Sequence, residues 1–484
     1  MNKKYLLASM AIIVLATILR LHNLGGTSLW FDEAIYATNS NAPFSEFLHK
    51  TRTINSSPII LPLTFWVLGE SIQTTFWIRF VPMVFGVLVV VVVLFLPRVG
   101  VPAPVALFSA LWMAVLPIQV HYSQEVREYS LAALIGILLV FCFLRSLQRP
   151  LVRHDVLFSV VLFLAPLCSY GTIFLSGTLL GLLVLLECMQ GKARPLRYAL
   201  PMGALALGLL ISYVITAKYQ MGIGKSWYLS ADYPPEGILS AGFWFAKSNA
   251  KYFVFQFGGI LPALVCLGSI GMFIFIVLRR RDFQFTELYI VVGFLFLVAA
   301  SIALSILGLY PYGGLRQHLF ASPLAILAAV ASFFWLVKSL KHRRILVGAF
   351  FAIVVLSGSI HGLPIVYRDQ QNITSPVGDI PGDVEDEKVF VYYGAVPAMR
   401  FHFPERHFFL SQCVTGQIVE MEKEVRDLGV GTVALVFSHM LFREDHELVQ
   451  RLLGDGYSLV LDQSYEGSQD GYPGSRLVVL EVKH

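Results

Sequence analysis

Long apolar runs alternate with short polar turns through the first three quarters of the chain. Eleven runs are of roughly membrane-spanning length. They cover about residues 1–24, 79–97, 103–120, 129–145, 156–169, 173–189, 199–217, 258–278, 288–308, 319–337 and 345–363. The pattern predicts a polytopic α-helical membrane protein. Because no small-residue cleavage site follows the first run, that run is interpreted as a helix and not as a signal peptide.

From about Tyr367 the chain changes to short apolar runs separated by polar segments. Strands are predicted over 389–393, 432–437, 457–461 and 477–482, and helical spacing covers 417–428 and 442–453. The alternation predicts a small α/β domain. The expected organisation is therefore a membrane domain over 1–365 and a soluble domain over 366–484. Without a Gly-rich phosphate loop, GxSxG or HExxH, the soluble domain is interpreted as a docking or lid module.

Composition supports the membrane assignment, since 56% of the 484 residues are hydrophobic and only 14% are charged. Such a chain cannot cover a globular surface with polar side chains, and its hydrophobicity excludes disorder. Five scattered cysteines without CxxC spacing indicate neither a disulfide scaffold nor a zinc site. No nucleic-acid motif is present, so membrane lipids and not nucleic acid are the expected surroundings.

Basic residues are concentrated in every second turn, where sixteen of them lie on one side of the predicted membrane. They are Lys3, Lys4, Arg98, Arg145, Arg149, Arg153, Lys192, Arg194, Arg197, Arg279, Arg280, Arg281, Lys338, Lys341, Arg343 and Arg344. The positive-inside rule makes that side cytoplasmic and places the other turns and the tail outside a plasma or inner membrane. Counting 57–69 as a span would reverse the later charges, so it is predicted to be an interfacial helix.

The outer turns carry the candidate chemistry. Asp32 and Glu33 follow the first span at the membrane boundary. A carboxylate there is energetically costly unless it is hydrated, paired with a cation or used for function. A solvated loop acid remains the alternative, as does Asp32 capping a helix that begins near Glu33. The last short outer turn contains Arg316, whose planar fork suits phosphate oxygens. A membrane-edge anchor is the alternative for that turn.

The second outer turn gathers His121, Glu125, Arg127, Glu128 and Tyr129 between apolar helices. A helix beginning near Gln124 would place Gln124 and Glu128 on one face, and Glu125 and Tyr129 on another. The alternative is a structural Arg–Glu pair that caps this helix. Aromatic residues of the outer loops either stack on sugars or lie at the membrane–water interface. The interface interpretation is favoured. Those residues are Trp227, Tyr228, Tyr233, Trp244, Tyr252 and Phe253.

Several segments in order resemble the GT-C glycosyltransferases, in the branch of protein O-mannosyltransferases and the lipid A aminoarabinose transferase. The resemblance lies in LRLHNLGGTSLWFDEA, SSPIILPLTFW, WIRFVPMVFGVL and HYSQEVREYSLAAL. It covers roughly residues 5–145 well and 290–335 weakly. It implies a GT-C-like fold and a polyprenyl-phosphate sugar as donor. Where mannosyl and aminoarabinosyl members carry His or Lys before a proline step, this chain has Ser56, Ser57 and Pro58.

The resemblance implies that Asp32 is the catalytic base with Glu33 beside it, and that the second acidic motif falls on Glu125 or Glu128. With His121, these two glutamates are expected to bind the acceptor or a metal. Because the cation before Pro58 is missing, the donor phosphate must find its positive charge elsewhere. The candidates are Arg316, Arg127, Arg79 and His318, and the sugar-binding candidates are Tyr310, Tyr312 and Tyr129. A divalent ion is an open alternative, although the sequence requires none.

The expected function is transfer of a sugar from a polyprenyl-phosphate donor to an extracytoplasmic glycan, lipid or protein. A single in-line displacement predicts inversion at the anomeric carbon. The same acids would serve equally well in a polymerase or ligase that uses an oligosaccharide-lipid donor. A lipid-linked sugar transporter or flippase is disfavoured, because the acids lie at the outer edges and not at the bilayer midplane. A membrane-displayed binding protein would need only one span.

Overall fold

The computed structural model describes residues 3–54, 57–72, 74–189, 191, 195–221, 233–235, 237–280, 286–314, 316–356, 372–413, 417–429, 431–438, 444–465 and 475–482. The chain forms two compact units. The first comprises 1–22, 48–64 and 79–366, and the second comprises 23–47, 65–78 and 367–484. The second unit thus takes in two segments that precede the predicted boundary near residue 365. The assignment of separate functional domains stays a prediction.

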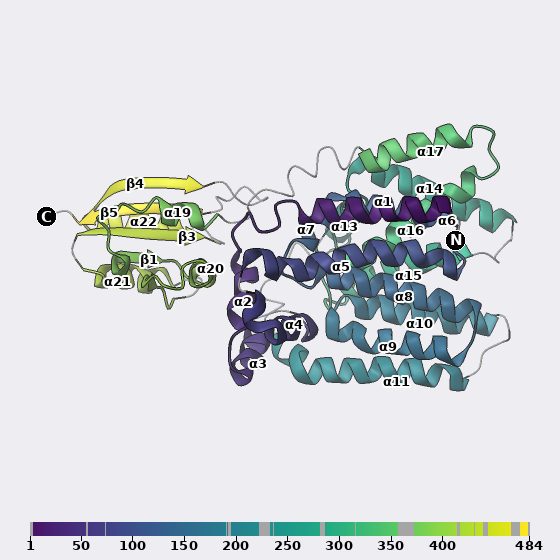
Figure 1. Ribbon diagram of the computed structural model, residues 1–484, viewed down its shortest axis with the longest axis horizontal. Coiled ribbons are helices and arrows are strands. Elements are labelled where there is room, and N and C mark those ends of the chain that lie inside the picture. The colour runs from purple at the N-terminus through teal and green to yellow at the C-terminus, as the bar shows by residue number, and fades with distance from the viewer. Residues whose placement is uncertain are drawn as a thin grey trace. The chain divides into compact units, whose positions relative to one another are not determined.

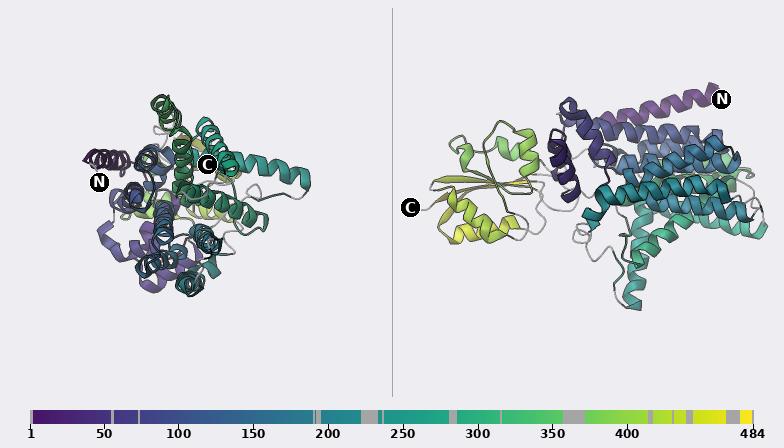
Figure 2. Two further views of the ribbon diagram at one scale, coloured as in Figure 1. Left: turned by 90° about the vertical axis from the view of Figure 1, so that its right-hand side faces the viewer. Right: turned by 90° about the horizontal axis from the view of Figure 1, so that it is seen from below.

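The first unit is a bundle of apolar helices that run side by side (Figures 1 and 2). Its elements are α1 (Lys3–Leu21), α5 (Thr75–Phe95), α6 (Ala103–Val115), α7 (Pro117–Ser123), α8 (Tyr129–Gln148), α9 (Val152–Cys168), α10 (Thr172–Met189), α11 (Pro195–Ser212), α13 (Ile238–Phe257), α14 (Ile260–Arg280), α15 (Thr286–Ile306), α16 (Ser322–Val337) and α17 (Arg343–Phe351). The shorter α3 (Phe44–Thr53) and α4 (Ile60–Leu68) precede α5 in the chain.

Eight helices in the described part of the chain are long and apolar enough to span a membrane, or nine if the bent α6–α7 pair counts as one span. The structure therefore does not confirm the predicted number of eleven spans. Helix α9 has 17 residues, and residues 357–371 beyond α17 lie outside the described residues. Within 57–69 the structure has the nine-residue α4, too short to span. The chain is an integral membrane protein by its fold and its apolar surface.

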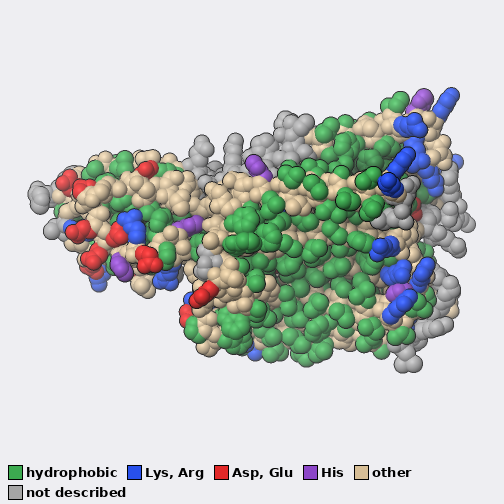
Figure 3. Space-filling view, in the orientation of Figure 1, with side chains coloured by type: hydrophobic (Ala, Val, Ile, Leu, Met, Phe, Trp, Pro, Cys, Tyr) green, Lys and Arg blue, Asp and Glu red, His purple; other side chains and the backbone are tan. Residues whose placement is uncertain are grey.

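Helices α8 and α16 form the interior of the bundle, because nearly all their side chains are buried. Helices α14, α15 and α6 pack around α16, while α9 and α10 pack on α8. The bundle surface is a broad belt of hydrophobic side chains, with Lys and Arg gathered at one end (Figure 3). Lipid contact explains an exposed apolar belt of this kind, which water would not tolerate.

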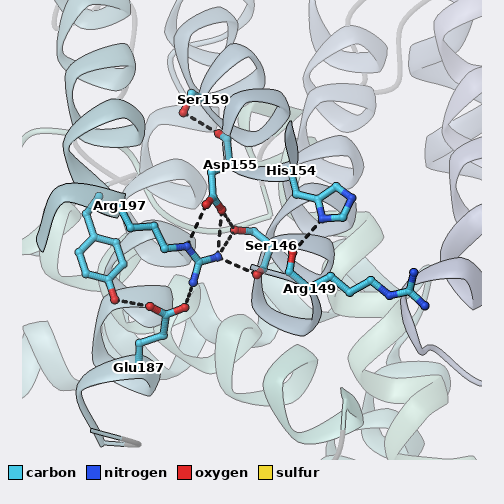
Figure 4. Close-up of polar contacts among 8 residues, drawn as sticks. Ser146, Arg149, His154, Asp155, Ser159, Glu187 and Arg197 are labelled. Atoms are coloured by element: carbon cyan, nitrogen blue, oxygen red, sulfur yellow. Dashed lines mark hydrogen bonds and ion pairs between the residues drawn. The ribbon is translucent and has the colours of Figure 1, made fainter. Parts of the chain in front are cut away.

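A buried ionic cluster joins α8, α9, α10 and α11 (Figure 4). The Arg197 guanidinium donates to both oxygens of Asp155 at 2.9 Å, to the Ser146 carbonyl at 2.7 Å, and to Glu187. Tyr198 donates to the same Glu187. Each charge in the cluster therefore has a partner, as burial requires.

The second unit contains a five-stranded sheet of order β2-β1-β3-β5-β4. Its strands are β1 (Val389–Val391), β2 (Phe409–Leu410), β3 (Thr432–Ser438), β4 (Tyr457–Tyr465) and β5 (Ser475–Val482). Strands β2, β1 and β3 are parallel, and β5 is antiparallel to β3 and β4. The four predicted strands and the small α/β domain are confirmed, while the two-residue β2 was not predicted.

Helices lie on both faces of this sheet (Figure 2). The apolar faces of α21 (Ile418–Asp427) and α22 (Glu444–Gly454) cover one face, with Met421 and Leu448 in contact with Leu435 and its strand neighbours. The short α19 (Thr374–Gly378) packs against β4 and β5. Helix α20 (Val396–His402) follows β1 and packs against α2 (Phe31–Asn39). The sheet domain therefore holds a helix from the start of the chain.

Candidate functional site

The second outer turn begins at a break between α6 and α7, which meet at a bend of 61°. Pro117 has no N–H, so the Met113 carbonyl four residues earlier loses its helical donor. Arg20 of α1 donates to the Met113 carbonyl at 3.0 Å and to the Ala114 carbonyl at 2.9 Å. Arg20 is 1% exposed, and its two hydrogen bonds complete the broken helix end from a neighbouring helix.

The turn itself, residues 124–128, connects α7 to α8 and is not helical. Its first side chain, Gln124, donates to the carbonyls of Arg20 at 2.9 Å and His22 at 2.8 Å. Helix α8 begins only at Tyr129, with Glu128 at its N-cap. The predicted helix start near Gln124 is wrong, because Gln124 is anchored to α1 and the Arg127 N–H bonds the Glu125 carbonyl two residues back.

Glu125 is buried between two basic side chains. Its carboxylate lies 3.7 Å from Arg316 and 3.8 Å from Nε2 of His121. The Glu125 side chain is 2% exposed, whereas the Arg316 side chain is 36% exposed. A pair of this kind holds the guanidinium in place from its buried side and leaves part of it accessible to an anion.

A second acid–base pair lies beside the first. Arg127 Nε is 3.7 Å from Glu128, and both side chains are largely buried. The Tyr129 ring lies under both guanidiniums, with its centroid 5.8 Å from Arg127 Cζ and 5.6 Å from Arg316 Cζ. Tyr122 packs edge-on against it at 5.0 Å. The structure thus brings Glu125, Glu128, Arg127, Arg316 and Tyr129 together, and their roles in acceptor, phosphate and sugar binding stay predictions.

The buried polar atoms of this cluster include two that form no hydrogen bond to a described residue, although Arg127 Nε lies 3.7 Å from one of them. They are Oε2 of Glu128 and the hydroxyl of Tyr129. Burying an unpaired polar group costs free energy, and sites that bind a ligand commonly contain such groups. We refer to Glu125, Arg127, Glu128, Tyr129 and Arg316 below as the charged turn.

Tyr170, between α9 and α10, was not predicted. Its hydroxyl donates to Oε1 of Gln220 at 2.7 Å and lies 3.0 Å from the hydroxyl of Thr216. Burial, with a smaller contribution from the Glu128 charge, raises the pKa of Tyr170. Gln220 also donates to the Ser57 carbonyl at 3.1 Å, which ties this network to the step before Pro58. A lone tyrosine at the end of an apolar run gave no signal in the sequence.

His318 is fully buried among aromatic rings. The rings of Tyr252, Tyr310 and Tyr312 lie 5.4, 5.4 and 5.7 Å from it, each edge-on. Neither ring nitrogen has a hydrogen-bond partner in the described part of the chain. The Tyr312 hydroxyl donates to Asn249 at 2.9 Å, and that of Tyr310 donates to the Gln317 carbonyl at 3.1 Å. These surroundings favour a structural packing role for His318. Phosphate binding by His318 and sugar binding by Tyr310 and Tyr312 stay predictions.

The remaining candidates lie in other places. Arg79 is buried in α5, and Ser57 is buried at the step before α4. Trp244 lies 6.5 Å from Tyr312, which supports a packing role for this outer aromatic residue. Trp227, Tyr228 and Ser56 lie outside the described residues. Among the residues that are described, no three His, Cys, Asp or Glu side chains gather as a metal site would require.

Asp32 and Glu33 lie in the second unit, in the first turn of α2. The N-cap is Trp30, so the alternative in which Asp32 caps this helix is wrong. Instead, Glu33 is buried and accepts the Trp30 N–H at 3.3 Å, as the acidic member of a capping box does. Asp32, the second helical residue, is only partly buried. The two neighbours thus differ, since Glu33 stabilises the helix start and Asp32 faces partly outward.

Comparison with solved structures identifies the fold. ArnT of Cupriavidus metallidurans matches with a TM-score of 0.56 in its apo state, at 13% identity over 98% of this chain and 97% of that one. Its complex with undecaprenyl phosphate matches with a TM-score of 0.51, at 14% identity over 98% of both chains. An Archaeoglobus fulgidus oligosaccharyltransferase in complex with zinc and sulfate gives 0.52, at 13% identity over 88% of this chain and 67% of that one.

These structures share the GT-C fold, and this chain has that fold. No protein-family profile and no curated protein sequence matches it. At 13–14% identity the likeness shows the fold alone. The chemistry must therefore be argued from the residues of the site.

Proposed function

We propose that this protein transfers a sugar from a polyprenyl-phosphate donor to an extracytoplasmic acceptor, with Asp32 as general base. The observation that carries the proposal is the Arg316–Glu125 pair, in which a buried carboxylate lies 3.7 Å from the guanidinium of a side chain that stays 36% exposed. The shared fold adds support, because one similar structure contains undecaprenyl phosphate and another contains sulfate. Each of these ligands presents the tetrahedral oxyanion that an arginine fork recognises.

In this proposal the charged turn binds the donor phosphate. A phosphodiester carries one negative charge, and the departing lipid phosphate gains a second as the bond from the anomeric carbon to oxygen breaks. Arg316 and Arg127 stabilise that developing charge, which is how a preorganised cation lowers a barrier. Tyr129 supports both guanidiniums from below through its ring face.

Asp32 supplies the other half of the reaction. The acceptor hydroxyl oxygen attacks the anomeric carbon from the face opposite the phosphate, and its proton passes to the Asp32 carboxylate. One displacement inverts the configuration and leaves no sugar on the enzyme. Glu33 is committed to the start of α2, so among the two neighbours Asp32 is the better candidate for the base.

The active face and the C-terminal domain are proposed to lie outside the cell. For the active face, support comes from the Lys and Arg side chains that gather at one end of the bundle, which the positive-inside rule makes cytoplasmic (Figure 3). A second candidate is transfer of a whole oligosaccharide, as the name of the archaeal oligosaccharyltransferase implies for that protein. The mass of the product separates the two, since one adds a monosaccharide and the other adds a chain. The acceptor remains a glycan, a lipid or a protein.

The test is binding of undecaprenyl phosphate to the purified protein in nanodiscs, followed by native mass spectrometry. Arg316→Ala is expected to weaken binding by one to two decades, since hydrogen bonds to charged groups contribute roughly 1.5–3 kcal/mol. Arg316→Lys keeps the positive charge but loses the planar fork of the guanidinium. Its affinity for undecaprenyl phosphate should therefore lie between those of the wild type and Arg316→Ala. Arg98→Ala removes an exposed arginine from the same unit and is the control. Equal binding by Arg316→Ala and wild type would refute the phosphate site.

A further inference from the structure

The segment that leads into α2 is hydrogen-bonded to the C-terminal domain. The Leu29 N–H donates to Nε2 of His402 at 3.0 Å, across 373 positions of sequence. One residue earlier, the Ser28 hydroxyl lies 3.4 Å from the hydroxyl of Thr374. Helix α20, which ends at His402, packs along α2. All of these residues belong to the second unit.

This contact lies next to the start of the helix that carries Asp32. Leu29 is fully buried, Trp30 is the N-cap, and Asp32 is the second helical residue. A nine-residue helix is marginal by itself, so its position depends on what packs against it. Any shift of Leu29 is carried to Asp32 within one helical turn.

His402 is suited to hold this position. Its ring lies edge-on to Phe401 at 5.2 Å and is tilted to Phe403 at 6.4 Å, so neighbours restrict its rotation. Because the Leu29 N–H donates to Nε2, that nitrogen carries no proton. Helix α20 in turn is fixed by the sheet, since it directly follows β1 at the centre of the parallel strands.

We propose that His402 is a positioning residue that sets the place of Asp32, which makes the C-terminal domain part of the catalytic apparatus. The inference rests on the proposed function, in which Asp32 is the base. It differs from the docking or lid role that the sequence suggested for the tail. A misplacement of about 1 Å in a reacting group can cost on the order of 10²-fold in rate, so a single anchoring hydrogen bond matters.

Three variants of the full-length protein in nanodiscs test the proposal. His402→Phe keeps an aromatic ring but removes the acceptor. His402→Gln restores an acceptor at similar reach. His407→Phe changes an exposed histidine of the same domain and serves as the control. The first measurement is hydrogen–deuterium exchange of residues 28–34. The second is the release of undecaprenyl phosphate from a panel of undecaprenyl-phosphate monosaccharides, with membrane extract supplying the acceptor hydroxyl, resolved into kcat and KM for the donor.

His402→Phe is expected to speed exchange over residues 28–34 and to lower kcat about tenfold with KM unchanged. His402→Gln should recover most of both, and His407→Phe should match wild type. Wild-type exchange in His402→Phe would overturn the proposal, as would wild-type kcat, or a loss in His402→Gln as large as in His402→Phe. If the wild-type protein releases no lipid phosphate from any donor, the proposed function fails, while the exchange data still decide whether His402 anchors α2.

Discussion

Arg20 donates to the carbonyl oxygen of Met113, the acceptor that Pro117 leaves without its helical donor. A charged residue in the first transmembrane helix thus completes a broken helix in the wall of the candidate site. The same end of α1 accepts two hydrogen bonds from Gln124, so the segment that leads into the charged turn depends on α1. The position of Glu125 follows from these contacts.

Arg20→Met is therefore expected to lower the thermal unfolding temperature in detergent by several degrees. The change leaves the Met113 and Ala114 carbonyls without their donor, and each hydrogen bond to a charged group is worth roughly 1.5–3 kcal/mol. Weaker undecaprenyl phosphate binding should accompany the loss, because the charged turn loosens. Lys3→Met removes an exposed charge from the same helix as a control. An Arg20→Met protein as stable as this control would show that the break needs no donor.

Glu125→Gln is expected to strengthen undecaprenyl phosphate binding severalfold while it removes a charge from the buried pair. The Glu125 carboxylate, 3.7 Å from Arg316, competes with phosphate for the same guanidinium. A double-mutant cycle with Arg316→Ala checks this, since the effect of Glu125→Gln should shrink when the guanidinium is gone. Weaker lipid binding by the single variant would contradict this and would mean that holding Arg316 in place outweighs the competition with phosphate.

Arg197→Met is expected to destabilise the bundle strongly, because it leaves Asp155 and Glu187 buried without their cation (Figure 4). Removing one partner of a buried ion pair costs about 3–5 kcal/mol. Arg149→Met, at an exposed position of the same end, is the matched control. Thermal unfolding of both variants in one detergent measures the difference, and similar temperatures would mean that the cluster contributes nothing.

The C-terminal domain should lose stability in acid, through Asp462. Arg476 donates to its two oxygens at 2.8 and 2.7 Å and holds the pKa of Asp462 below its ordinary value of about 3.9. The resulting stabilisation is complete above about pH 4 and is lost as the pH falls through the lower, folded-state pKa. Thermal unfolding of the wild type should thus show a loss below pH 4 that Asp462→Asn lacks. Parallel curves for the two proteins would exclude this pair as its cause.

The apolar runs and the four strands could be predicted because burial imposes periodicities of 3.6 and 2 on the sequence. The break at Pro117 fell inside a run that was predicted to be one span over 103–120. Pro117 can be read from the sequence, but the arginine that donates to the carbonyl freed by the break comes from α1 and cannot. Strand β2 is two residues long and takes its structure from pairing with β1, so no local pattern reveals it.

The members of the charged turn were singled out from residue type, and in the structure they lie close together, while the roles predicted for them stay predictions. Their partners could not be predicted, because each contact joins positions far apart in the chain. Arg316 reaches Glu125 from the last outer turn, and His402 reaches Leu29 from the C-terminal domain. The different roles of Asp32 and Glu33 likewise depend on where α2 begins, which a pair of adjacent acids does not indicate.

The central claim is that Asp32 deprotonates an acceptor as the sugar leaves a polyprenyl phosphate, and Asp32→Asn in the purified protein tests it most directly. The measurement is sugar transfer from the panel of undecaprenyl-phosphate monosaccharides to membrane extracts, with undecaprenyl phosphate binding measured on the same sample. The account predicts a loss of transfer of about 10²–10⁴-fold with lipid binding retained, and a much smaller loss for Glu33→Gln. Transfer by Asp32→Asn within about tenfold of wild type would contradict it.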